Sequence, residues 1–139
     1  MFDTCQLPEH ADDTAPDGSE VRVLLRLAGG GMAHFRLPGG RTSIAVHHRS
    51  VEEIWYVVAG QGELWRQRGP LESIQPLTAG VCVSIPLGTR FQFRALGDAP
   101  LDIIGMTVPP WPGADEAVPG PGRWEPNPGP GAPTPERPV

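Results

Sequence analysis

Nine short runs of apolar or alternating residues, each closed by glycine or proline, constrain the fold of this chain more than any other feature. They follow one another between residues 20 and 108 at a spacing of roughly ten residues, which is typical of all-β folds. Several alternate with a period of two, as in "EVRVLLRL" at 20–27 and "RFQFRAL" at 90–96. This period places alternate side chains on opposite faces of a strand, whereas no run keeps the 3.6-residue period of a helix. The pattern predicts an all-β sandwich or barrel.

The two ends of the chain differ in composition from this middle region. Residues 1–20 carry six acidic residues and neither Lys nor Arg, and residues 109–139 hold eleven Pro and five Gly. Proline donates no backbone N–H and does not fit a sheet ladder. We therefore expect an irregular acidic arm over 1–19, one β-domain over 20–108 and an extended Pro/Gly-rich tail over 109–139. Trp111 and Trp124 are expected to pin the tail, either to this chain or to a partner subunit.

Length, charge and cysteine usage exclude several classes of protein. The 139 residues suffice for one domain with a real core, and the net charge of −5 argues against a nucleic-acid partner. No basic segment followed by an apolar one opens the chain, and no apolar run reaches membrane-spanning length. A cytoplasmic protein without a membrane partner is expected. Cys5 and Cys82 form no C-x-x-C pair, and Cys82 is expected to be a small buried core residue.

The segment "VHHRSVEEIWYVVAG" at 46–60 carries the clearest motif. Together with Gly40, it resembles the first motif of the cupins, which reads G-x5-H-x-H-x(3–4)-E-x6-G. In this register Glu53 and Gly60 match the motif glutamate and closing glycine, and His48 matches the second histidine. Val46 stands where the first histidine belongs.

A second segment resembles the other cupin motif, G-x5-P-x-G-x2-H-x3-N. Gly80, Pro86 and Gly88 match it, but Phe91 replaces the histidine and Ala95 the asparagine. The resemblance covers about residues 20–108 and implies a cupin jelly-roll β-barrel. It also implies that the barrel interior is the ligand site, where most cupins hold a divalent metal with three histidines and a glutamate.

The replaced positions weaken the expectation of a metal. Positions 46 and 48 share one strand face and His47 lies on the other, so His47 is no substitute for Val46. Only His48 and Glu53 then remain as inward donors, whereas catalytic metal sites normally have three protein ligands. No cofactor is therefore predicted, and a divalent metal, if present, would be held by His48 and Glu53. Side chains that would complete a metal site if they faced inward are His34, Gln75, Cys82 and Gln92.

The sequence leads to a hypothesis about function. Glu53 and His48 are expected to act as a buried acid–base pair on a small metabolite, in isomerase, epimerase, cyclase or lyase chemistry without a firmly bound metal. The apolar residues expected to line their pocket are Val46, Trp55, Val57, Phe91 and Phe93. Two alternatives stay open: a non-catalytic cupin that binds a small apolar or anionic ligand, and a metal-dependent oxygenase or isomerase with a reduced ligand set. The resemblance to cupins also implies a homodimer.

Overall fold

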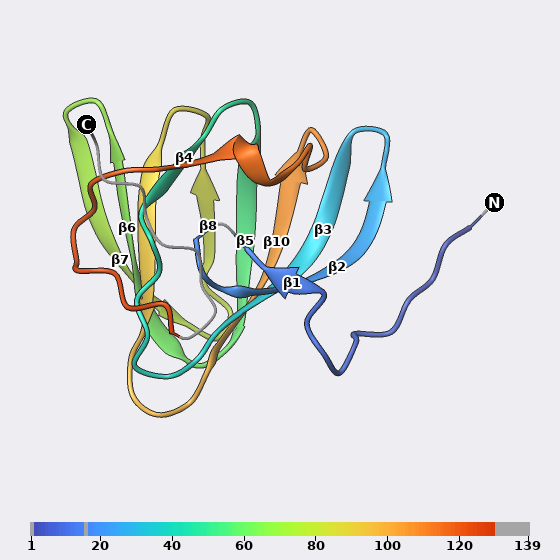
Figure 1. The fold of residues 1–139 in the computed structure, drawn as a ribbon, viewed down its shortest axis with the longest axis horizontal. Coiled ribbons are helices and arrows are strands. Elements are labelled where there is room, and N and C mark those ends of the chain that lie inside the picture. Colours follow the sequence, from blue (N-terminus) through green and yellow to red (C-terminus); the bar gives the residue numbers. More distant parts are fainter. Residues whose placement is uncertain (1, 16, 130–139) are drawn as a thin grey trace.

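The computed structural model describes residues 2–15 and 17–129, and this part of the chain folds into two antiparallel sheets that face each other (Figure 1). The six-stranded sheet has the order β1 (Asp13–Thr14), β2 (Glu20–Leu27), β3 (Gly30–Leu37), β10 (Leu101–Val108), β5 (Glu52–Ala59) and β8 (Cys82–Ile85). The five-stranded sheet has the order β11 (Ala117–Pro119), β4 (Val46–His48), β9 (Arg90–Ala95), β6 (Gln61–Arg68) and β7 (Leu71–Thr78). A short 3-10 helix, η1 (Ala114–Glu116), precedes β11.

The expected all-β jelly roll is confirmed, and its two sheets are not closed into one hydrogen-bonded barrel. The sheets instead bury their inner faces against each other, as in a sandwich. Among the described residues, no helix is long and apolar enough to cross a membrane.

The alternation of β5 sets which residues enter the core. Glu53, Trp55 and Val57 are buried on the inner face, whereas Glu52 and Tyr56 are exposed on the outer one. Apolar side chains from both sheets complete the core, among them Leu37, Leu64, Leu77, Ile85, Phe93, Leu101 and Ile103. Two of the motif glycines close the turns around β5 and β8: Gly60 and Gly80 have φ of 91° and 92°, values that favour glycine.

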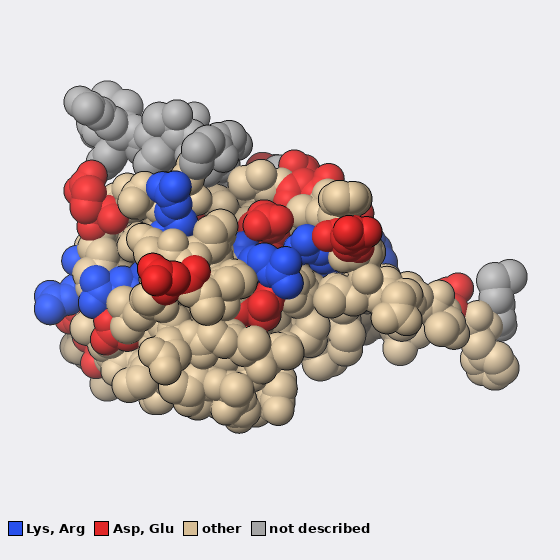
Figure 2. Space-filling model, turned by 90° about the horizontal axis from the view of Figure 1, so that it is seen from below, with Lys and Arg blue, Asp and Glu red and all other residues tan. Residues whose placement is uncertain are grey.

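The outer face of the six-stranded sheet is unusually apolar. Ile54 of β5 pairs with Met106 of β10, which pairs with Met32 of β3, and these outward side chains are all exposed. Tyr56 stands beside them and pairs with Cys82. In Figure 2 a broad surface without Lys, Arg, Asp or Glu occupies the lower middle of the body. Cys82 is exposed on this face, so the expectation that it is a buried core residue is wrong: its position on β8 has outward parity.

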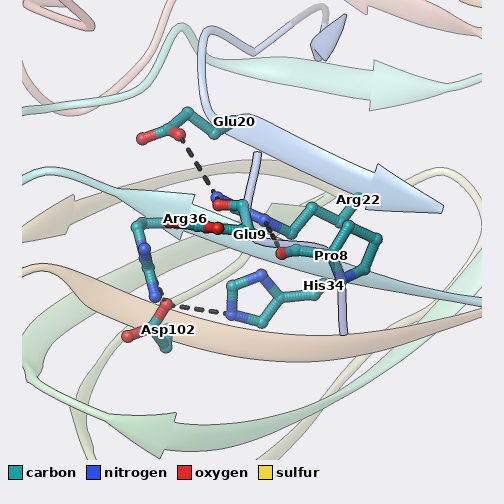
Figure 3. A network of polar contacts seen from close by, with 7 residues as sticks. All are labelled: Pro8, Glu9, Glu20, Arg22, His34, Arg36 and Asp102. Carbon is teal, nitrogen blue, oxygen red and sulfur yellow. Dashed lines mark hydrogen bonds and ion pairs between the residues drawn. The ribbon is translucent and has the colours of Figure 1, made fainter. Parts of the chain in front are cut away.

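A polar cluster holds the N-terminal segment against the neighbouring part of the same outer face (Figure 3). Arg22 is 3% exposed, and its guanidinium donates to the carbonyl oxygens of Pro8, at 2.9 Å, and Glu9, at 3.0 Å. Beside it, His34 Nε2 lies 2.9 Å from Asp102 Oδ1. Farther along the chain, β1 pairs with β2. The acidic segment is thus attached to the sheet over part of its length.

The C-terminal segment crosses the outer face of the five-stranded sheet. β11 pairs with β4, and Asn127 forms a bridge with Thr42. Gln92 faces outward, as its parity requires, but it is fully buried because it exchanges hydrogen bonds with the backbone of Trp124. The Trp124 ring lies under the Arg94 guanidinium, 4.3 Å from its carbon. The segment is pinned to this chain; the expected tail residues 130–139 lie outside the described part.

Candidate functional site

A cavity of about 1060 Å³ opens between the sheets, beside β1 and β4. Its wall includes both residues expected to act as an acid–base pair, His48 at the end of β4 and Glu53 near the start of β5. Val46, Trp55 and Phe91 also lie on this wall, as expected. Val57 and Phe93 do not: both are buried in the hydrophobic core, away from the cavity.

Five aromatic rings form an unbroken row along the cavity wall. The ring centroids of Phe35 and Trp55 are 6.3 Å apart, and Trp55 lies 5.7 Å from Phe91. Phe91 is followed by His48, at 5.2 Å, and His48 by Trp111, at 5.1 Å. All but the first of these contacts are edge-to-face, the geometry that aromatic quadrupoles favour.

A glycine makes room for the start of this row. Gly105 of β10 is the register partner of Trp55. A Cβ atom at this position would lie 2.6 Å from the Phe35 ring. Any side chain at 105 would therefore push Phe35 and Trp55 apart.

Glu53 is held in its neutral form by its surroundings. It is 5% exposed, and burial raises its pKa to about 8. The Trp55 indole N–H donates to Glu53 Oε2 at 2.7 Å, and this hydrogen bond lowers the pKa but does not offset the burial. Because Oε2 accepts this bond, the proton of the neutral acid is best placed on Oε1.

His48 is also neutral near pH 7, for the same reason. It is 6% exposed, and burial lowers its pKa to about 4 despite the carboxylate of Glu116 nearby. Its Nδ1 is buried without a hydrogen-bond partner among the described residues. Buried polar atoms are rarely left unpaired, so an unpaired imidazole nitrogen in a cavity wall marks a position that a ligand would satisfy. No hydrogen bond joins His48 to Glu53 within residues 2–15 and 17–129.

Glu116 of η1 fixes the loop that separates the two residues. It is 3% exposed, and its carboxylate accepts hydrogen bonds from the backbone N–H groups of Ser50 and Val51. Burial opposes ionisation of Glu116, but these bonds outweigh it and hold its pKa below the ordinary value. Glu116 therefore sets the path of the chain between His48 and Glu53.

Asp17 is one of the residues at this site that sequence reasoning missed, as are Phe35 and Glu116. It is 9% exposed, lies on the cavity wall and accepts hydrogen bonds from the N–H and hydroxyl of Ser19. Burial raises its pKa, and its charge raises that of Glu53 in turn. Its place in an acidic, Pro-containing segment gave no signal of burial. The signal that existed was the short D-x-S spacing of a local turn, in which an Asp caps a backbone N–H.

The donor set does not fit a metal ion. Val46 and Phe91 are register partners on adjacent strands, and the Phe91 ring packs against His48 where a further ligand would be needed. Within the described part of the chain, no group of three or more His, Cys, Asp or Glu side chains is placed to hold a metal. The four residues that would have completed such a site, His34, Gln75, Cys82 and Gln92, do not lie on the cavity wall. Catalytic metal sites normally require three protein ligands, and only His48 and Glu53 of the expected set remain.

Two facing antiparallel sheets with a cavity that opens between them define a small β-sandwich protein of the jelly-roll class. The cupin domain model matches residues 33–107, more than half of the chain, and the chain therefore belongs to the cupin family.

Solved structures of cupin-fold proteins resemble this chain in fold. BH2720 from Bacillus halodurans matches with a TM-score of 0.61 at 18% identity, over 73% of this chain and 76% of that one. KdgF from Halomonas sp. matches with a TM-score of 0.58 at 20% identity, over 66% of this chain and 79% of that one. A histidine-to-glutamine variant of Streptomyces PAC13, solved with uridine, matches with a TM-score of 0.63 at 14% identity, over 83% and 89% respectively.

Proposed function

We propose that this cupin is a small-molecule enzyme in which Glu53 donates a proton and His48 accepts one. The observation that carries the proposal is one cavity wall with two buried ionisable groups, whose pKa values burial moves apart, to about 8 and about 4. A carboxylic acid that stays protonated at pH 7 is a general acid, and an imidazole that stays unprotonated is a general base. The proposed proton transfers are assigned to these two side chains, and no metal is given a role, because the residues present do not form a three-ligand site.

The chemistry that such a pair supports is proton transfer without redox change. Isomerisation, epimerisation, cyclisation and lyase reactions each remove one proton and deliver another. Both groups are buried, at 5% and 6% exposure, so little water competes with a substrate for their hydrogen bonds. The cupin-fold neighbour solved with uridine supports a small polar metabolite as the ligand, by analogy of fold alone.

The proposal is tested by proton exchange with solvent. A panel of small metabolites is incubated with the protein in deuterium oxide, and NMR follows deuterium entering C–H positions or a new product. For the substrate found, Glu53→Gln and His48→Gln are each expected to lower the rate by about 10²- to 10⁴-fold, the usual contribution of a general acid or base. The matched controls are Glu52→Gln and His47→Gln, the adjacent residues with outward parity, which should leave the rate unchanged.

The pH dependence gives a second readout. The pH–rate profile should be bell-shaped: the rate falls below about pH 4 as His48 becomes protonated, and above about pH 8 as Glu53 ionises. Exchange that survives both substitutions would remove the acid–base proposal. Ligand binding with no exchange at all would favour the non-catalytic binding protein instead.

A further inference from the structure

We propose that the ligand of this cavity carries a positive charge, as an amine or a quaternary ammonium group. The inference deepens the proposed function, on which it rests, by naming the chemical class of its substrate. It stands on three features of the cavity: the balance of charges on its wall, the row of aromatic rings, and the unpartnered imidazole of His48.

The charged residues on the wall are mostly acidic. Five carboxyl groups line the cavity, against the two guanidinium groups of Arg26 and Arg49. The acidic residues are Asp12, Asp13, Asp17, Glu53 and Asp115. None of them lies within ion-pair distance of an Arg or His side chain among the described residues, whose ion pairs all involve other acids. Glu53 keeps its proton at pH 7 and adds no charge. The charge of the ionised aspartates is not neutralised locally, and it favours a cation over an anion in the cavity.

The acidic residues lie at different depths in the cavity. Asp115 is exposed and Asp17 is buried, so the carboxyl groups extend from the rim into the cavity. Arg49 does not offset them at close range, because its Nε donates to the backbone oxygen of Asp115 and not to a carboxylate.

The aromatic row supplies the second half of a cation site. Phe35, Trp55, Phe91 and Trp111 lie on the wall with centroid spacings of 5.1–6.3 Å through His48. The π-face of an aromatic ring attracts ammonium groups, most strongly for tryptophan and where water is excluded. Phe35 and Trp111 are only partly buried and are the rings that a ligand can reach directly, whereas Trp55 and Phe91 are 2% and 1% exposed and support them from behind.

His48 is the observation that points to a bound polar ligand independently of the acids. It is more than nine-tenths buried, lies on the cavity wall, and leaves Nδ1 without a partner. A neutral imidazole has one nitrogen that accepts a hydrogen bond. The N–H of an amine or a hydroxyl group of the ligand would satisfy that acceptor.

The test compares three probes of nearly the same shape by isothermal titration calorimetry on the full chain. The first is choline, and the second is neohexyl alcohol, in which carbon replaces the choline nitrogen. The third is tert-butylacetate, the anion 3,3-dimethylbutanoate, which has the same apolar end and a negative charge. Choline is expected to bind about tenfold more tightly than the neutral alcohol, the range that cation–π contacts provide in a desolvated site. Added salt should weaken the binding of choline and leave that of the alcohol unchanged.

Two substitutions with matched controls locate the effect. Trp111→Leu keeps an apolar side chain but removes a ring, and should reduce the preference for choline over the alcohol; Trp124→Leu, off the cavity wall, should not. Asp115→Asn removes a carboxylate that makes no hydrogen bond with the described residues. It should weaken the binding of choline and strengthen the binding of tert-butylacetate. The control Asp98→Asn, at an exposed acid away from the cavity wall, should change neither.

Three results would overturn the inference: equal or tighter binding of the alcohol, tighter binding of tert-butylacetate, or no binding of choline at millimolar concentration. These results are separate from the failure of the proposed function. Selective choline binding without any proton exchange would contradict the proposed enzymatic function and support the cation site. Proton exchange that depends on Glu53, on substrates without a positive charge, would do the reverse.

Discussion

Burial acts on Glu53 and His48 in the same way and moves their pKa values in opposite directions. Both side chains lose the solvent that stabilises their charged forms, so the acid keeps its proton and the base stays without one. The hydrogen bond from the Trp55 N–H lowers the pKa of Glu53, and the charge of Asp17 raises it. The same hydrogen bond holds the Glu53 side chain beside the Trp55 ring. In the proposed mechanism Glu53 is the proton donor and His48 the proton acceptor, and neither is charged at neutral pH.

The pH dependence of stability follows from these shifts. The pKa of Glu53 rises from 4.5 to about 8 on folding, so the folded protein keeps a proton that the unfolded chain releases, and stability is lost as pH rises through this range. The pKa of His48 falls from 6.5 to about 4, so its contribution grows as pH rises from 4 to 6.5 and then stays constant. Above pH 6.5, the remaining change is the loss of stability caused by the two acids whose pKa values are raised, Glu53 and Asp17.

Glu53→Gln should therefore change the pH profile of unfolding. Between pH 6.5 and 8 the free energy of unfolding should fall by up to about 2 kcal/mol more for the wild type than for the variant. The reason is that each pH unit between the unfolded and folded pKa values of Glu53 lowers this free energy by about 1.4 kcal/mol. Urea denaturation across this range measures the difference, and Glu52→Gln on the outer face is the control. Parallel profiles for wild type and Glu53→Gln would mean that Glu53 is ionised in the folded protein.

Local periodicity explains which site residues the sequence could predict. The parity of β5 is sufficient to place Glu53 and Trp55 on the inner face, since alternation is a property of the strand itself. Asp17, Trp111 and Glu116 reach the site from segments without alternation, and only tertiary contacts bring them there. Val57 and Phe93 have inward parity as well, but parity does not tell a cavity wall from the packed core.

At the scale of elements, the terminal segments act as covers for outward-facing polar side chains. The N-terminal segment buries Arg22 on the six-stranded sheet, and the C-terminal segment buries Gln92 on the other. Alternation predicts which face these side chains occupy but not that a distant segment covers that face. Arg22 is consequently a buried anchor in a position that the sequence pattern assigns to a solvated surface.

Arg22→Met tests the attachment of the N-terminal segment. The variant loses both hydrogen bonds to the carbonyls of Pro8 and Glu9 while it keeps most of the apolar stem, and hydrogen bonds to charged groups contribute about 1.5–3 kcal/mol each. Residues before β1 should become sensitive to a nonspecific protease, with the sheets still folded by circular dichroism. Arg26→Met, an exposed arginine on the same strand, is the control and should cleave like the wild type. Equal resistance of the Arg22 variant would show that the segment is held by other contacts.

Among the described residues, the outer face of the six-stranded sheet is an extended apolar surface, and this is the scale at which a homodimer is proposed. Ile54, Tyr56 and Met106 are 58%, 50% and 44% exposed on adjacent strands of the six-stranded sheet. Exposed apolar patches of this kind usually mark an interaction surface. A second copy of the chain is the occupant we propose, because an apolar sheet face without charged residues at its centre can pair with the same face of another copy.

Light scattering after size exclusion measures this directly. The wild type is expected at twice the chain mass of 14.9 kDa, and Ile54→Glu at the mass of one chain. The control Leu71→Glu, an exposed residue on the five-stranded sheet, should remain a dimer. A wild type of single mass, or an Ile54→Glu dimer, would contradict this interface.

The fold was predictable at this scale because turn spacing and two motifs report on the whole domain. What they could not report is the lack of closure between the sheets, since hydrogen bonding between strands distant in sequence leaves no local pattern. The replacement of metal-ligand positions by Val46 and Phe91 was visible in the sequence, whereas the acidic lining of the cavity was not, because most of it comes from segments outside the two motifs.

The most direct test of the acid–base site is a carbon NMR titration of the Glu53 carboxyl group, assigned by its disappearance in Glu53→Gln. The predicted result is a pKa of about 8, with Glu53 protonated at pH 7, and a His48 imidazole in the same sample that titrates at about 4. A Glu53 pKa near its ordinary value of 4.5 would contradict the account, because the carboxyl group would then be ionised at neutral pH and have no proton to donate.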